Sequence, residues 1–81
     1  MTSLLVFTVH AKTMMHERLI QEDWVHNTVN DPDIIEEKLD DEIHYLKQIP
    51  PEGGKFLRVI VNPSVSPPRV ITAFFDMRVR Q

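Results

Sequence analysis

A histidine and an arginine near the N-terminus stand at a spacing that could support acid–base chemistry. His10 and Arg18 bracket a stretch that follows the apolar run 4–7 and precedes an acidic segment beginning near Gln21. An imidazole exchanges protons near neutral pH, and a guanidinium holds anionic groups. We expect His10 to lie at a strand–helix junction, with Arg18 about two turns further along the helix.

Two basic residues in later strands extend this candidate set. Lys47 and Arg58 stand among mainly apolar residues, and a lone guanidinium in such a strand needs a partner or an open groove. A salt bridge from Arg58 to Asp76 or Glu37 is the alternative.

A purely structural interpretation of the N-terminal pair also stays open. His10 would then cap the helix through a bond to the backbone, and Arg18 would pair with a nearby carboxylate.

Metal chemistry is not expected. His16-Glu17 would begin the zinc motif His-Glu-x-x-His, but Ile20 stands where the second histidine is needed. The other histidines show no ligand spacing, and we expect His26 and His44 to face solvent. No metal and no cofactor are therefore predicted.

Composition and charge limit the classes of function. The chain has 81 residues, enough for one domain over 1–81, and it contains no cysteine, which excludes disulfides, thiolate zinc sites and cysteine nucleophiles. Its net charge of −3 argues against strong nonspecific binding to nucleic acid. The charges are divided, however: residues 17–42 hold ten acidic and two basic residues, whereas the last strands are mainly basic. The apolar runs are too short to span a membrane, and we expect a cytoplasmic protein.

Hydrophobic periodicity predicts the elements that must position these residues. A strand at 4–9 is followed by a helix capped by Thr8, and a second helix begins near Gln21 and stops at Asn30-Asp31-Pro32. Trp24 belongs to the apolar stripe of that second helix, with base stacking as the alternative role. Four further strands are predicted at 34–38, 43–49, 55–61 and 69–77. The order β-α-α-β-β-β-β is α+β, with two N-terminal helices packed on a mainly antiparallel twisted sheet.

Strand alternation predicts which rows face the helices. Apolar rows should pack on the helices, and these rows are Leu57, Val59, Val61 in one strand and Ile71, Ala73, Phe75 in the last. The opposite rows hold Arg58 and Asp76 and should face outward. Val70, Thr72 and Phe74 share the outward row with Asp76.

The order of these residues resembles a family of small bacterial and phage-borne proteins of unknown function. Members of that family look related to RelE/ParE-type and BrnT-like toxins. The resemblance covers nearly the whole chain and is carried by His10-Ala11-x-x-x-Met15-x-Glu17-Arg18, Glu22-Asp23-x-Val25, Asn30-Asp31-Pro32-Asp33, Tyr45-x-Lys47, and the strands at 57–61 and 70–76.

The resemblance implies a RelE-like fold and a metal-independent endoribonuclease that cuts mRNA on the ribosome and is neutralised by an antitoxin protein. Such cleavage needs a base for the 2′-OH and cations for the phosphorane-like transition state. Carried over by position, the catalytic residues are His10, Arg18, Lys47 and Arg58. Tyr45 and Asp76 are the carried-over binding residues.

Two departures from the family pattern are visible. Leu19 stands where relatives have the glycine that ends the first helix, which suggests a different turn or a longer helix. Met77 separates Asp76 from Arg78, which puts a role for Arg78 in doubt because strand alternation would move it to the other face.

Two functions therefore compete. The first is a toxin-like endoribonuclease of a toxin–antitoxin system, with RNA or the ribosome as target. The second is a non-catalytic protein-interaction module of the same fold, with a homodimer as one arrangement. The acidic charge favours the second, and the His and Arg positions favour the first.

Overall fold

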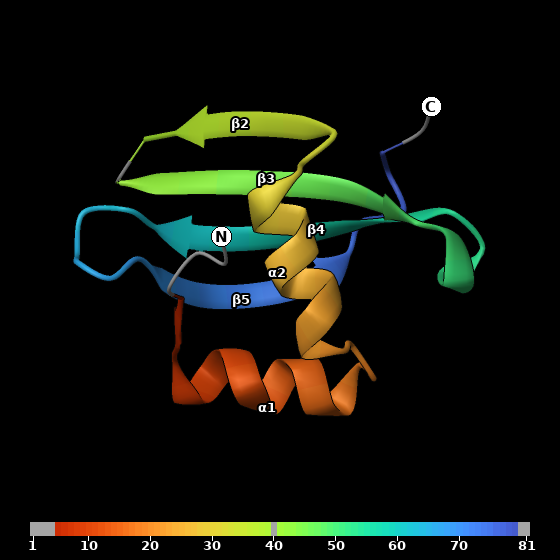
Figure 1. The fold of residues 1–81 in the computed structure, drawn as a ribbon, viewed down its shortest axis with the longest axis horizontal. Coiled ribbons are helices and arrows are strands. Elements are labelled where there is room, and N and C mark those ends of the chain that lie inside the picture. The colour runs from red at the N-terminus through yellow and green to blue at the C-terminus, as the bar shows by residue number, and fades with distance from the viewer. Residues whose placement is uncertain (1–4, 40, 80–81) are drawn as a thin grey trace.

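The computed structural model describes residues 5–39 and 41–79. Within this part the chain forms two α-helices and a five-stranded sheet (Figure 1). The elements in chain order are β1 (Val6–Phe7), α1 (Val9–Glu17), α2 (Glu22–Asn30), β2 (Ile34–Lys38), β3 (Glu42–Ile49), a 3₁₀ turn (Pro50–Glu52), β4 (Lys55–Asn62) and β5 (Arg69–Phe75).

The sheet has the strand order β1-β5-β4-β3-β2. β1 pairs with β5 in parallel, and the other three pairings are antiparallel. The predicted α+β class with a mainly antiparallel sheet is confirmed, and the parallel β1 makes the sheet mixed. Strands β2 to β5 lie side by side in chain order. β1 and α1, from the start of the chain, lie next to the last strand, β5.

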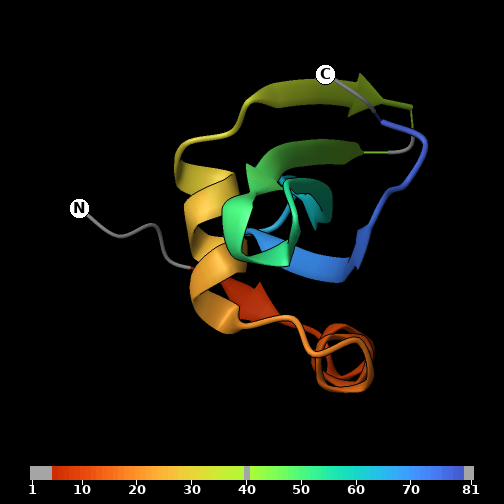
Figure 2. The same cartoon turned by 90° about the vertical axis from the view of Figure 1, so that its right-hand side faces the viewer.

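The helices and the C-terminal segment occupy different sides of the curved sheet. α2 packs over β3 and β4, while α1 runs beside β5 (Figures 1 and 2). The face opposite α2 carries no described helix, and the chain after β5 turns across it toward the β2 side (Figure 2). We call it the helix-free face.

The N-terminal end of α1 is capped as predicted. Thr8 has an extended backbone, and its hydroxyl accepts a hydrogen bond from the Ala11 N–H over 3.0 Å. β1 consequently stops at Phe7, and Val9 already belongs to the helix, so the predicted strand 4–9 is too long. Leu4 lies outside the described residues.

The C-terminal end of α1 corrects the expectation about Leu19. The N–H of Ile20 bonds to the Met15 carbonyl over 2.9 Å, and the N–H of Leu19 to the His16 carbonyl over 3.3 Å. These two bonds define a Schellman motif, which requires a left-handed residue at Leu19. Leu19 has φ 56°, so the leucine adopts the left-handed turn that glycine favours, and the helix is not extended.

The core lies between the helices and one face of the sheet. Leu57, Val59 and Val61 are buried against the helices, so the predicted helix-facing row of β4 is confirmed. The core cluster consists of Ala11, Met15, Ile20, Val25, Ile49, Leu57, Val59, Val61, Val70 and Ala73, with Trp24, Tyr45 and Phe75 packed against it.

The predicted alternation is wrong at the start of β5. Val61 pairs with Val70, but Ile60 pairs with Thr72, so Ile71 is the extra residue of a bulge. The bulge places Val70 in the core on the same side as Ala73, and not in the outward row.

β5 also ends earlier than predicted, at Phe75, because Asp76 begins a turn. Beyond that turn, strand alternation no longer determines where a side chain points.

Both α-helices have nine residues, and no helix in the described part of the chain is long and apolar enough to cross a membrane.

Candidate functional site

Arg58 is the centre of a network of charged side chains on the helix-free face. Its Nε donates to Oδ2 of Asp76, and its Nη1 donates to Oε1 of Glu36, each over 2.8 Å. Nη1 also lies 2.8 Å from Nδ1 of His44. Arg58 points away from the helices as predicted, but it is 8% exposed and therefore buried where an outward-facing side chain was expected.

The sheet register brings these partners together from separate strands. Leu46 pairs with Arg58, and Glu36 pairs with His44 one step along the same face. Residues directly opposite or diagonal on one face of a sheet lie within reach of long side chains. Asp76 joins from beyond β5, where its N–H bonds to the carbonyl of Phe56 over 2.9 Å.

Asp76 is held by two guanidinium groups. Besides Arg58, Arg78 binds it through Nε to Oδ1 over 3.0 Å and through Nη2 to Oδ2 over 3.1 Å, and the Arg78 N–H also donates to Oδ1. The hydrogen bonds from Arg78, together with the bond from Arg58, hold the pKa of Asp76 far below its usual range despite burial. The same contact raises the pKa of Arg78. The expectation that Met77 moves the Arg78 guanidinium to the other face of the last strand is wrong, because β5 ends at Phe75 and Arg78 lies beyond it, bound to Asp76.

Glu36 links the network to the surface. Its Oε1 lies 3.1 Å from Nζ of Lys38, which places the carboxylate between Lys38 and Arg58. The hydrogen bond from Arg58, and next the one from Lys38, lowers the pKa of Glu36. Arg58 thus has two acidic partners: Asp76, as one alternative predicted, and Glu36 in place of Glu37, which alternation puts on the other face.

His44 corrects the prediction that it faces solvent. Its side chain is 13% exposed and lies between Arg58 and Oε1 of Glu42, which is 3.2 Å from Nε2. Because a guanidinium has no acceptor, Nδ1 must accept the bond from Arg58, and Nε2 then carries the proton donated to Glu42. His44 was missed because its role depends on strand pairing. The sequence signal that could have found it is the spacing of two residues between His44 and Leu46, which puts both side chains on one face of a strand. That Leu46 pairs with Arg58 is shown by the structure.

The second histidine expected to face solvent is also partly enclosed. His26 in α2 contacts the ring of Phe7 edge-on, with 5.6 Å between ring centroids. Its Nδ1 is buried and has no hydrogen-bond partner.

His10 lies apart from the network. It is exposed in the first turn of α1, and its side chain makes no hydrogen bond or ion pair with another described residue. The alternative role of His10 as the helix cap is wrong, because Thr8 supplies that cap.

Arg18 lies at the other end of α1 and binds the sheet edge. Its Nη1 donates to the carbonyl of Ala73 over 3.0 Å, and its guanidinium lies 5.9 Å from the ring centroid of Phe74. The expected carboxylate partner is replaced by this backbone oxygen.

Lys47 and Tyr45 lie on the helix-facing side of the sheet, opposite Arg58. Lys47 donates from Nζ to the carbonyl of Asp31 over 2.9 Å and lies 3.4 Å from Oδ2 of the same residue. Asp31 is the C-cap of α2, so the lysine neutralises the negative end of that helix. Tyr45 packs against the core. The four predicted catalytic residues therefore lie at four separate places, and Asp76 is the one candidate that meets Arg58.

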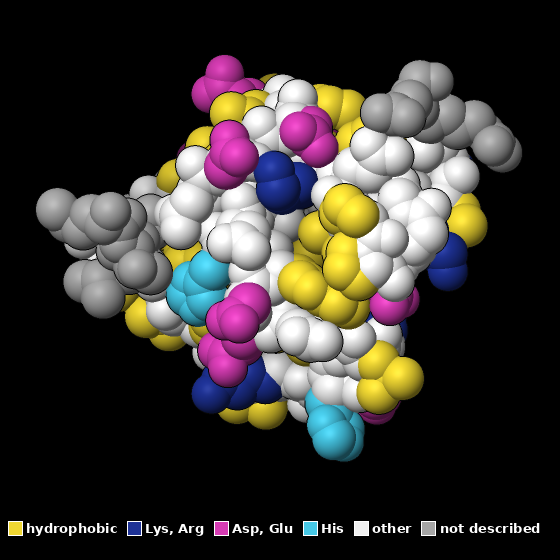
Figure 3. Space-filling model, turned by 45° about the vertical axis from the view of Figure 1, so that its right-hand side comes forward, with side chains coloured by type: hydrophobic (Ala, Val, Ile, Leu, Met, Phe, Trp, Pro, Cys, Tyr) yellow, Lys and Arg dark blue, Asp and Glu magenta, His cyan; other side chains and the backbone are white. Residues whose placement is uncertain are grey.

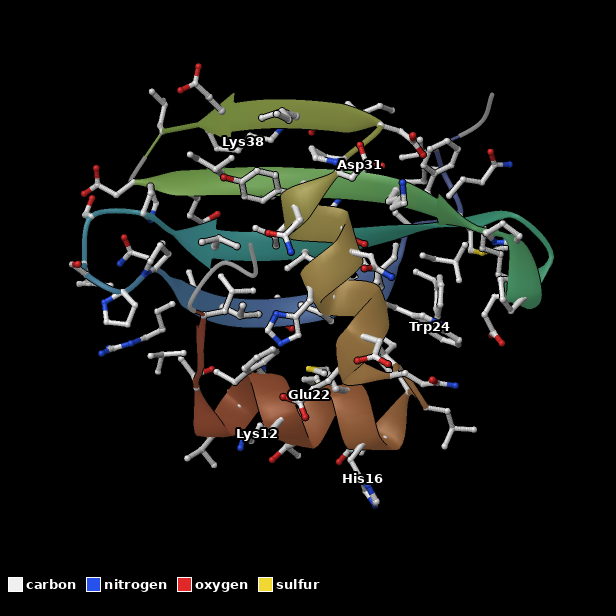
Figure 4. The ribbon with its side chains drawn as sticks, in the orientation of Figure 1. Lys12, His16, Glu22, Trp24, Asp31 and Lys38 are labelled. Carbon is white, nitrogen blue, oxygen red and sulfur yellow. The ribbon has the colours of Figure 1, made fainter. Side chains whose placement is uncertain are left out.

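A second feature is an open hollow between α1 and the start of α2. It is lined by Lys12, Met15, His16, Ile20 and Glu22. Figure 4 shows Lys12 and His16 extending from α1 below Glu22, on the side away from the sheet. No three His, Asp or Glu side chains within residues 5–39 and 41–79 are grouped so that they could hold a metal ion.

Comparison with known protein families gives a match over most of the chain. A family model described as a domain of unknown function (DUF4258) matches residues 7–75, which extends from β1 to the end of β5. No curated protein and no solved structure gives a significant match.

Proposed function

The chain belongs to the DUF4258 family of domains of unknown function, and we propose that it acts as a non-catalytic protein-binding module. The observation that carries the proposal is the separation of the residues that an enzyme of the resembled RelE/ParE type would need together. Lys47 and Arg58 lie on opposite faces of the sheet, and His10 contacts neither.

The cations around Arg58 support this function because each of them is already bound by a carboxylate. Arg58 is bound by Glu36 and Asp76, Arg78 by Asp76, and Lys38 by Glu36. A phosphate group would have to compete with these carboxylates at short range.

Among the described residues, the α2 side of the molecule also lacks a broad basic area. Figure 3, which views that side, shows acidic side chains scattered among the few basic ones. Protein–RNA affinity draws mainly on such an area, whereas protein partners do not require one.

One contact favours a second candidate, a toxin-like metal-independent endoribonuclease with an antitoxin partner. His44 and Arg58 place an imidazole and a guanidinium 2.8 Å apart, the pairing of a proton-transfer group with a phosphate-binding group. In this candidate the centre is His44 with Arg58, and His10 is not part of it. Arg58 would have to release Nδ1 before His44 could act as the base, because Nε2 already carries a proton.

RNA cleavage and growth of an expressing bacterium distinguish the two functions. The purified chain is incubated with RNA alone and with translating ribosomes, beside His44→Gln and His10→Ala variants, and each form is also induced in cells. We expect no cleavage and normal growth with all three. Cleavage by the native chain that His44→Gln abolishes and His10→Ala retains would establish the second candidate and refute the first.

A further inference from the structure

The two edges of the sheet differ in whether their backbone groups already have hydrogen-bond partners. On the β5 side, β1 pairs with Arg69 and Val70, the Thr8 hydroxyl donates to the carbonyl of Ile71 over 3.2 Å, and Arg18 binds the carbonyl of Ala73. These contacts occupy backbone groups that an open edge would offer to another strand. On the other side, no strand in the described part of the chain pairs with the outer edge of β2, which is outermost in Figure 1.

The side chains along this edge include exposed apolar residues. Ile35 and Glu37 lie on one side of β2, and Leu39 follows directly after the strand; Ile35 is 57% and Leu39 88% exposed. We call these three residues the exposed row. α2 packs over β3 and β4 and leaves this row uncovered. A lysine often guards such an edge, but Lys38 points to the other face and is paired with Glu36 (Figure 4).

The charge around this edge selects the partner. Residues 31–42 contain seven acidic residues and one lysine, and in the described part of this stretch Asp33, Glu37 and Asp41 are exposed. A second copy of the chain pairing through β2 would bring two such acidic stretches together, and like charges across paired strands are destabilising. A basic partner would instead gain opposite-charge pairs beside the exposed apolar residues.

We propose that the outer edge of β2 binds an extended segment of a partner protein, in which apolar residues alternate with lysine or arginine, as a sixth strand of the sheet. Backbone hydrogen bonds to β2 supply the affinity, and the exposed row of Ile35, Glu37 and Leu39 supplies the selectivity. The inference rests on the proposed protein-binding function and names the edge and the chemistry of the partner.

Nuclear magnetic resonance of the full, isotope-labelled chain tests the inference. The probe is a synthetic peptide of alternating lysine and valine, and the control peptide alternates glutamate and valine. The lysine peptide is expected to shift the amide signals of 34–39 and to slow their hydrogen exchange, while the glutamate peptide does neither. Glu37→Lys and Ile35→Lys should each weaken binding by about tenfold, because a favourable contact is replaced by charge repulsion.

The matched control is Glu17→Lys, which makes the same change of charge at an exposed position of α1 and should bind like the native chain. Circular dichroism confirms that each variant is folded. Equal binding by Glu37→Lys, or shifts that map outside β2, would overturn the inference. So would concentration-dependent dimerisation through β2 without peptide, which would make a second copy the occupant. If the chain cleaves RNA and still binds the lysine peptide, the non-catalytic function is refuted and the peptide-binding edge is not. If the chain neither cleaves RNA nor binds the peptide, the peptide-binding edge is refuted and the non-catalytic function is not.

Discussion

Arg58 and Asp76 form a buried ion pair that joins the middle of the sheet to the segment after its last strand. Nε of Arg58 lies 2.8 Å from Oδ2 of Asp76, and the two side chains are 10% and 2% exposed. Two charges removed from water are tolerable only where further hydrogen bonds complete both groups. Glu36 and His44 accept further hydrogen bonds from the guanidinium of Arg58. Arg78 donates further hydrogen bonds to the carboxylate of Asp76. This network fastens β2, β4 and the C-terminal segment to one another.

Removing Arg58 should be costly. Arg58→Met leaves Asp76 and Glu36 without their shared partner, and the loss of one member of a buried pair costs about 3–5 kcal/mol of unfolding free energy. Urea denaturation monitored by circular dichroism measures the change. Lys38→Met is the control, because it breaks a surface pair with the same Glu36 and should cost less than about 1 kcal/mol. Equal losses in both variants would contradict the central role of Arg58.

Stability should fall in acid because of Asp76. Its pKa in the folded chain is below the value of about 3.9 for a free aspartate, so its contribution is complete above about pH 5 and is lost as the pH falls through 4 and below. The lowered pKa of Glu36 acts in the same direction. Thermal unfolding at several pH values should show Asp76→Asn less stable than the native chain at pH 7, with a flatter pH profile. Asp23→Asn, at an exposed position of α2, should keep the native slope.

Replacing the left-handed leucine should stabilise the chain. Leu19 is 81% exposed with φ 56°, a conformation that costs an L-residue about 1–2 kcal/mol. Leu19→Gly relieves this strain and adds some unfolded-state entropy, for a net gain of about 0.5–1 kcal/mol. The comparison is Leu39→Gly, an equally exposed leucine that is not left-handed, which should gain nothing. A loss of stability in Leu19→Gly would contradict the assigned turn.

The Thr8 hydroxyl should stabilise the fold through two hydrogen bonds, one that it accepts and one that it donates. Thr8→Ala removes the acceptor for the Ala11 N–H and the donor to the Ile71 carbonyl, so we expect a cost of about 1–2 kcal/mol. Thr13→Ala lies at an exposed position within α1, where alanine favours the helix, and should be neutral or slightly stabilising. Chemical denaturation of both variants decides whether the cap or the loss of a threonine is responsible.

Local chemistry allowed much of the fold to be predicted from the sequence. The Thr8 cap, the strand 34–38 and the helix-facing row Leu57, Val59, Val61 follow from the geometry of single elements. Misjudged boundaries lie where two signals compete for one residue. Val9 is β-branched but follows a helix cap, and Asp76 continues an apolar strand but starts a turn.

The candidate site depends on the tertiary structure. The register of β3 against β4 places Lys47 opposite Leu57, on the other face from Arg58, and the carboxylates that meet Arg58 depend on the pairing of β2 with β3 and on the turn after β5. A bulge at Ile71 moves Val70 into the core, and a Schellman motif makes Leu19 left-handed. By itself the sequence determined the types of the elements and the helix-facing row of β4, because these follow from neighbours a few positions apart. The tertiary structure alone decided the partners of Arg58, His44 and Asp76, because register and turns set which distant side chains share one space.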